Sequence, residues 1–224
     1  MGEDDAHSDC SRCAGLGGGS RRARAARVKR GHQEMTRWDF KPGRAVSALL
    51  VLLLLVRAAD AQLANENLLV RVPPGYKVGS RVERGTMVMD EMVPTGQTVD
   101  DWTEMVTVQI FHGLKAPPEK FRDTLRQSWV AACPGGSGAD VISSTENGYP
   151  VLVWLLDCPK NPQSGKPEMT WFKAIAGNDS FYLVQKAFKF KPDKEQLDRW
   201  MAYLKSVTVC DTRVPARACP PTRQ

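Results

Sequence analysis

The stretch Tyr149–Cys158 reads YPVLVWLLDC, and it decides the fold class. Residues 151–156 are all apolar, a run too short to cross a membrane, and turn signals lie on both sides at Asn147-Gly148 and Pro159. Pro150 and two β-branched valines argue against a buried helix, which is the main alternative. We therefore predict a central strand that is buried on both faces, with further layers of structure on either side of its sheet.

The N-terminal part of the chain predicts export. Three basic residues precede an apolar core of twelve residues, Ala45–Val56, and the small-residue triplet Ala59-Asp60-Ala61 follows it. This pattern is typical of a secretory signal peptide, here spanning 35–61 and cleaved after Ala61. A membrane helix needs about 20 apolar residues, so an uncleaved anchor is the weaker alternative. We expect a periplasmic or secreted protein that meets the membrane only transiently, through its signal peptide.

Residues 1–34 precede this signal peptide, although signal peptides begin at the N-terminus. We expect Met35 to be the true start and residues 1–34 to be a non-native or disordered leader. The leader contains Cys10-x-x-Cys13 with His7, which is half of a zinc site without a second ligand pair nearby. Its basic run at 21–30 leaves nucleic-acid binding as a further alternative.

Most of the net positive charge lies in the part that export would remove. The chain has 31 Lys+Arg and 25 Asp+Glu, of which 11 and 7 precede residue 62, so 20 and 18 remain and the net charge is +2. This balance predicts no nucleic-acid partner. The remaining 163 residues suit one domain, which we place at 62–210. The Pro/Arg-rich segment 211–224 is expected to be a flexible tail.

Four cysteines follow the signal peptide: Cys133, Cys158, Cys210 and Cys219. Four cysteines in an exported chain indicate two disulfides, with three possible connectivities. We favour Cys133–Cys158, which ties the end of a helix to the end of the central strand, and Cys210–Cys219, which closes a small loop. Four free thiols are the alternative, and an oxidising compartment disfavours it.

Periodicity and turn signals predict two helices and seven strands. Apolar residues at three- and four-residue steps indicate helices over 117–132 and 192–205, and Asp193 with Gln196 forms a capping box for the second. Strands are predicted at 67–72, 85–93, 104–111, 140–145, 151–156, 168–176 and 181–190, with a turn at 76–79 and one helical turn at 98–102. Asn147-Gly148 and Gly177–Ser180 should close two hairpins. The expected class is α+β, with a mostly antiparallel sheet of about six to seven strands and two main helices.

This order of elements resembles the PsbP/Mog-like fold over about 67–209. The opening segment 70–76 (VRVPPGY), a strand followed by Pro, Gly and an aromatic residue, adds to the resemblance. That fold is shared by a chloroplast photosystem accessory protein, a nuclear-transport factor and bacterial envelope lipoproteins. Separately, residues 98–109 (TVDDWTEMVTVQ) resemble a segment of uncharacterised exported bacterial proteins. The second resemblance brings no assigned activity with it, and the four cysteines are not a hallmark of the PsbP/Mog-like fold.

The sequence after the signal peptide lacks catalytic signatures. His112 is its only histidine, so a Ser-His-Asp or Cys-His arrangement would depend on one residue. No G-x-S-x-G, G-x-G-x-x-G or P-loop is present, and we predict no cofactor. The function expected from these observations is a non-enzymatic one, in which the exported protein binds an envelope protein or a small ligand.

Candidate binding residues gather near position 100. Trp102 lies in a polar loop, where an exposed tryptophan can anchor a ligand or a partner; packing over a sheet edge is the alternative. Asp100, Asp101 and Glu104 form the best acidic group. They define the alternative function, a hydrolase or metal-dependent enzyme, which requires these carboxylates to converge in one pocket together with His112.

Overall fold

The computed structural model describes residues 63–220; the predicted leader 1–34 and signal peptide 35–61 lie outside the described residues. The elements are β1 (Glu66–Leu69), β2 (Tyr76–Arg84), β3 (Met87–Pro94), β4 (Glu104–His112), α1 (Pro118–Ala132), β5 (Ser137–Glu146), β6 (Tyr149–Cys158), β7 (Glu168–Ala176), β8 (Ser180–Phe188), α2 (Lys194–Ser206), β9 (Thr208–Asp211) and a short 3₁₀ helix at Pro215–Arg217. The predicted α+β class, with its antiparallel sheet and two helices, is confirmed. Within the described residues, neither helix is long and apolar enough to cross a membrane.

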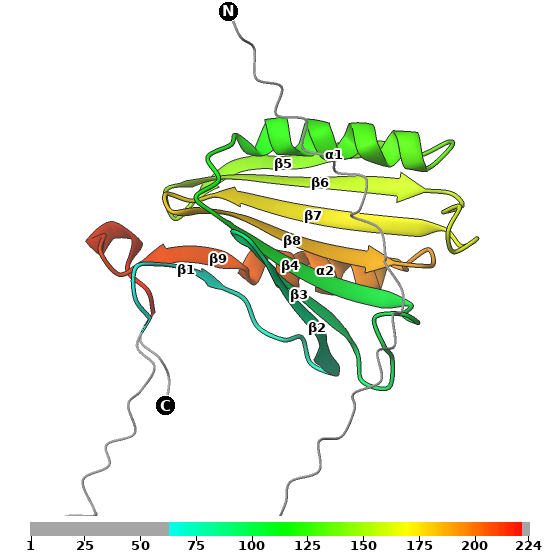
Figure 1. Ribbon diagram of the computed structural model, residues 1–224, viewed down its shortest axis with the longest axis horizontal. Helices are drawn as coiled ribbons and strands as arrows, with labels where there is room; N and C mark the ends of the chain where they lie inside the picture. The colour runs from blue at the N-terminus through cyan, green and yellow to red at the C-terminus, as the bar shows by residue number, and fades with distance from the viewer. Residues whose placement is uncertain (1–62, 221–224) are drawn as a thin grey trace, which may run out of the picture. The chain divides into compact units, whose positions relative to one another are not determined.

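Seven strands form one antiparallel sheet in the order β2-β3-β4-β8-β7-β6-β5, while β1 and β9 pair separately (Figure 1). The stretch that predicted the fold is β6, and its side chains are buried on both faces as expected, with Val153 at 5% exposure on one face and Trp154 at 0% on the other. Its predicted central position is wrong. Since β4 pairs with β8, the centre of the sheet is β8 and only β5 lies beyond β6.

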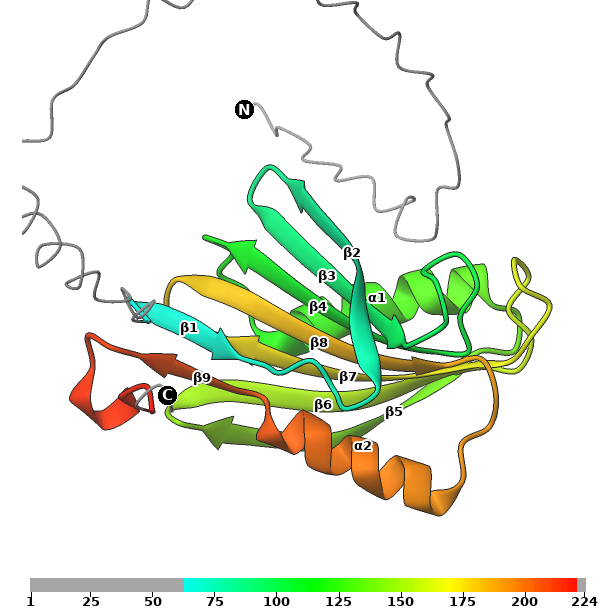
Figure 2. The same cartoon turned by 90° about the horizontal axis from the view of Figure 1, so that it is seen from below.

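The two faces of the sheet are covered by different elements (Figure 2). Helix α1 packs Phe121, Leu125 and Trp129 against one face, because these residues recur at helical spacing. Helix α2 covers part of the other face with Trp200 and Leu204, and the β1–β9 pair covers the rest. The predicted capping box of α2 is present between Asp193 and Gln196.

Strand β2 is the main element that the sequence did not predict. The expected turn at 76–79 is wrong, since β2 begins at Tyr76 and the β2–β3 hairpin turns at Gly85, which has φ +56°. Four strands therefore precede α1 instead of three. The error has a physical cause: β2 is an edge strand with six of its nine residues exposed, so it lacks the apolar alternation of a half-buried strand.

The predicted helical turn at 98–102 is also absent; there the Thr98 hydroxyl accepts a hydrogen bond from the Asp101 amide in a non-helical loop.

The hairpins and cross-links follow the sequence closely. Asn147 and Gly148 both have positive φ, 49° and 75°, and join β5 to β6, as the favoured two-residue turn requires. Both predicted disulfides, Cys133–Cys158 and Cys210–Cys219, are present.

The boundary predicted at residue 210 falls inside β9, which continues to the buried Asp211. Residues 211–220 of the predicted tail make contacts with the domain: Arg213 forms ion pairs with Asp211 and Asp179, and Arg217 lies over the Tyr149 ring. The remainder of the tail, 221–224, lies outside the described residues.

Candidate binding edge at strand β5

The structure separates Glu104 from the other two carboxylates of the predicted acidic group, Asp100 and Asp101. Glu104 lies at the start of β4, where its carboxylate accepts hydrogen bonds from the Lys186 ammonium at 2.7 Å and the Tyr76 hydroxyl at 2.9 Å. Asp100 and Asp101 are exposed in the preceding loop. Within 63–220, no group of three His, Cys, Asp or Glu side chains could hold a metal ion. The geometry therefore gives the metal-dependent alternative no ligand set in this part of the chain.

Lys186, the partner of Glu104, has 0% side-chain exposure. Its ammonium lies 3.6 Å from the centre of the Trp200 ring, a cation–π contact. Burial lowers the pKa of Lys186, and the Glu104 carboxylate opposes that shift. Burial, together with Glu104, raises the pKa of Tyr76. This pair was not predicted from the sequence, although Lys186 alternates in phase with the buried Val184 and Phe188.

Trp102 is half-buried, and the Lys189 ammonium lies 3.9 Å from the centre of its ring. Burial lowers the pKa of this lysine. One face of the indole is thus occupied by a side chain of the same domain, so Trp102 offers less surface to a partner than the sequence analysis expected.

His112 borders a polar hollow of about 390 Å³ between β1, β4 and β8. Its Nδ1 lies 3.2 Å from the Ser180 hydroxyl, but Ser180 is only 4% exposed. Glu66 fills the hollow's polar side, since its carboxylate accepts bonds from the backbone amides of residues 178–180 and from the Tyr182 hydroxyl. The polar groups here are satisfied within the domain, which indicates a structural role.

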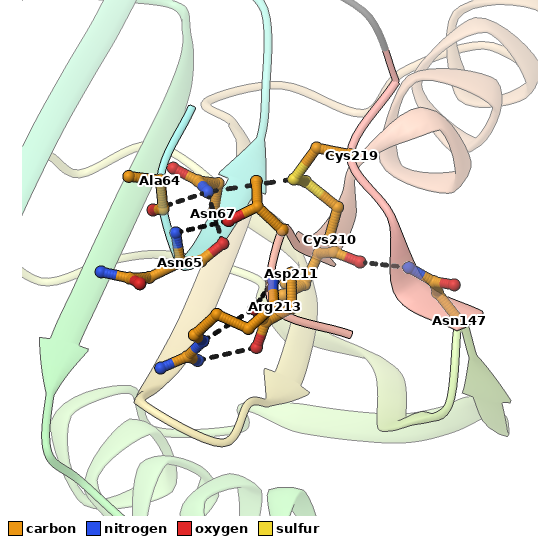
Figure 3. Close-up of a disulfide and its surroundings, with 10 residues drawn as sticks. Ala64, Asn65, Asn67, Asn147, Cys210, Asp211, Arg213 and Cys219 are labelled. Carbon is orange, nitrogen blue, oxygen red and sulfur yellow. Dashed lines mark hydrogen bonds and ion pairs between the residues drawn. A yellow bond between two sulfur atoms is a disulfide. The ribbon is translucent and has the colours of Figure 1, made fainter. Parts of the chain in front are cut away.

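The Cys210–Cys219 disulfide belongs to the same structural region (Figure 3). Beside it, the Asn67 amide donates to the carbonyls of Ala64 and Asn65. The Arg213 guanidinium donates hydrogen bonds to the Asp211 carboxylate. These bonds lower the pKa of the Asp211 carboxyl to about 2. The loop that the disulfide closes is therefore fastened to the end of β9.

Strand β5 is different, because its side chains face solvent and its outer edge pairs with no strand of residues 63–220. Nine of its ten residues are exposed, and Val141 and Ile142 are 45% and 49% exposed. The register with β6 shifts between Asp140 and Ile142, so Val141 is an extra residue in a β-bulge. Beyond the bulge, residues 142–146 pair regularly with β6. An edge strand of this kind presents unpaired N–H and C=O groups to another chain.

Both acidic side chains of β5 form ion pairs with basic side chains of the same domain. Asp140 is bound by Arg122 and by Arg126 of α1, the latter at 2.8 Å. Glu146 lies 2.6 Å from the Lys173 ammonium, which also donates to two backbone carbonyls at the end of α2. The opposite edge strand, β2, exposes Lys77, Glu83 and Arg84 besides Arg81. Charged edges resist pairing with other strands, so β5 is the better candidate for binding.

The comparisons with known proteins give little further information. No family model and no curated protein matches the chain. Among solved structures, the 1.9 Å crystal structure of the Saccharomyces cerevisiae Ran-binding protein Mog1p is similar, with a TM-score of 0.36 and 12% identity over 63% of this chain and 85% of that chain. This is a weak similarity of fold, and it carries no argument about function.

Proposed function

We propose that the protein is exported to the periplasm or secreted, and that it acts without enzymatic activity by binding a partner polypeptide as an added strand at β5. The observation that carries this proposal is the charge-compensated edge of β5, which no strand of residues 63–220 pairs with. In strand addition, main-chain hydrogen bonds provide affinity and alternate side chains provide specificity. The fitting partner is an extended, uncharged segment.

Export is supported by the predicted signal peptide and by the two disulfides, which are typical of oxidising compartments. Intact-mass measurement of protein from its native host should give a chain that begins at Gln62 and is four hydrogens lighter than the reduced form.

The binding test uses a photo-crosslinking residue, p-benzoylphenylalanine, placed at Ile142 in the protein of the native host. Val78 on β2 is a matched control, because it is also 49% exposed and also lies on an edge strand. We expect Ile142 to capture an extended segment of another envelope protein, and Val78 to capture none. A synthetic peptide of that segment should bind the wild type and lose at least tenfold in affinity with Ile142→Asp. Equal capture at both positions, or capture at neither, would contradict the proposal.

A further inference from the structure

Residues 142–146 of β5 are complementary to themselves. This segment, Ile-Ser-Ser-Thr-Glu, is the regular part of the strand beyond the bulge. In an antiparallel pair of two such segments centred on Ser144, Ser144 faces its own copy, Ser143 faces Thr145, and Ile142 faces Glu146. Cross-strand Ser and Thr pairs stabilise antiparallel sheets, and no like charges stand opposite each other.

The charges of the segment also permit this pairing. The two Glu146 side chains would lie at opposite ends of the ladder, about 13 Å apart at the rise of an extended chain, which exceeds the screening length of about 8 Å at physiological salt. Each Glu146 keeps its own Lys173. Asp140 lies outside the ladder and keeps Arg122 and Arg126.

We propose that, when no partner is bound, the β5 edge is closed by β5 of a second copy of the chain in a two-fold symmetric, antiparallel pair. This inference rests on the proposed function in treating β5 as a strand-pairing edge. Two-fold dimers are the commonest closed assemblies, and the same patch then serves on both subunits. The pair protects Ile142 and the free backbone groups, which otherwise invite aggregation.

The dimer regulates binding at the same site. Because the second copy and the partner segment compete for one edge, a partner binds only after the pair dissociates. The apparent affinity for a partner is then reduced by the fraction of edges that are already paired, and dilution should raise it.

The test uses purified exported protein with its disulfides intact. Sedimentation equilibrium should show a reversible monomer–dimer association. Its dissociation constant should be at least tenfold larger for Ile142→Asp and unchanged for Val78→Asp. A Ser144→Cys variant should form a disulfide-linked dimer, since the two Cα atoms would come within the 4.4–6.8 Å that a disulfide needs; Val78→Cys should not. Circular dichroism and thermal melting confirm that each variant is folded.

The outcomes separate the two proposals. A protein that stays monomeric, with Ser144→Cys uncrosslinked, overturns the dimer and leaves partner capture at Ile142 to stand. A dimer linked through Ser144 with no partner captured supports the pair and contradicts the proposed function. A dimer that forms equally in Ile142→Asp, or that is linked through Val78→Cys, uses another surface and overturns the inference.

Discussion

The two faces of the seven-stranded sheet are buried in different ways. Under α1 the face consists of apolar side chains such as Trp154 and Phe172, and the Cys133–Cys158 disulfide fastens the helix end to β6. Under α2 the face includes Lys173 and Lys186, which are 1% and 0% exposed and rely on Glu146 and Glu104. Both faces bury apolar side chains, but the α2 face also buries ion pairs, which the α1 face does not rely on.

This difference separates two kinds of sensitivity. Apolar burial stabilises by about 25 cal/mol per Å² and does not depend on protonation. A buried ion pair depends on both partners, since removing one leaves a charge that is costly to bury. We expect the α1 face to respond chiefly to loss of its disulfide, and the α2 face to respond to loss of charge and to pH.

The largest effect is expected for Lys186→Met, which keeps the length of the side chain and removes the ammonium. The Glu104 carboxylate then loses its cation, and the free energy of unfolding should fall by about 3–5 kcal/mol, measured by urea unfolding at pH 7. Leu183→Met on the α1 face is the matched control, and should cost less than about 1.5 kcal/mol. The double variant Glu104→Gln/Lys186→Met should recover part of the loss. If both single variants cost the same, the two faces do not differ as described.

The second effect concerns the α1 face. Replacing Cys133 and Cys158 by serine opens a loop of 25 residues and should destabilise by about 3.5 kcal/mol in the chain-entropy model. The pair Cys210→Ser/Cys219→Ser, whose separation is 9, should cost about 2.5 kcal/mol by the same relation. Urea unfolding of both variants measures the order. A larger loss for the shorter loop would show that strain or lost packing, rather than loop entropy, sets the effect.

The smallest effect is a pH dependence of the α2 face. Burial lowers the pKa of Lys186 from its ordinary value of 10.5, so the unfolded chain holds this proton to higher pH than the folded one. The wild type should therefore gain stability, on the order of 1 kcal/mol between pH 7 and pH 9. Lys186→Met should lack this gain, while Lys173, whose pKa burial also lowers, contributes the same slope to both proteins. Parallel pH curves for the two proteins would contradict the assignment.

Local signals predicted the parts of the fold that depend on local physics. The buried run of β6, the Asn147-Gly148 turn, the α2 capping box and both disulfide pairings all appear in the structure. Each of these follows from a short stretch whose residue types restrict the backbone or the packing.

The parts that failed depend on distant partners. Whether β6 is central depends on the β4–β8 pairing between residues 68 to 84 positions apart, which no local pattern encodes. β2 is polar because it lies at an edge. The candidate site was missed for a related reason: a strand rich in serine looks like any exposed strand until the sheet order shows that its outer edge is free. Asp100, Asp101 and Glu104 are close in sequence, but Glu104 turns inward to Lys186 because of its position on β4.

The pairing of β1 with β9 sets a lower limit on how soon the domain can be completed. Glu66 is opposite Asp211 in this ladder, so the two strands are about 145 residues apart in the chain. Until β9 has been synthesised, Val151 and Ile175 lack the cover that Val209 supplies. A folding intermediate that lacks β9 therefore carries an uncovered apolar patch on this face of the sheet.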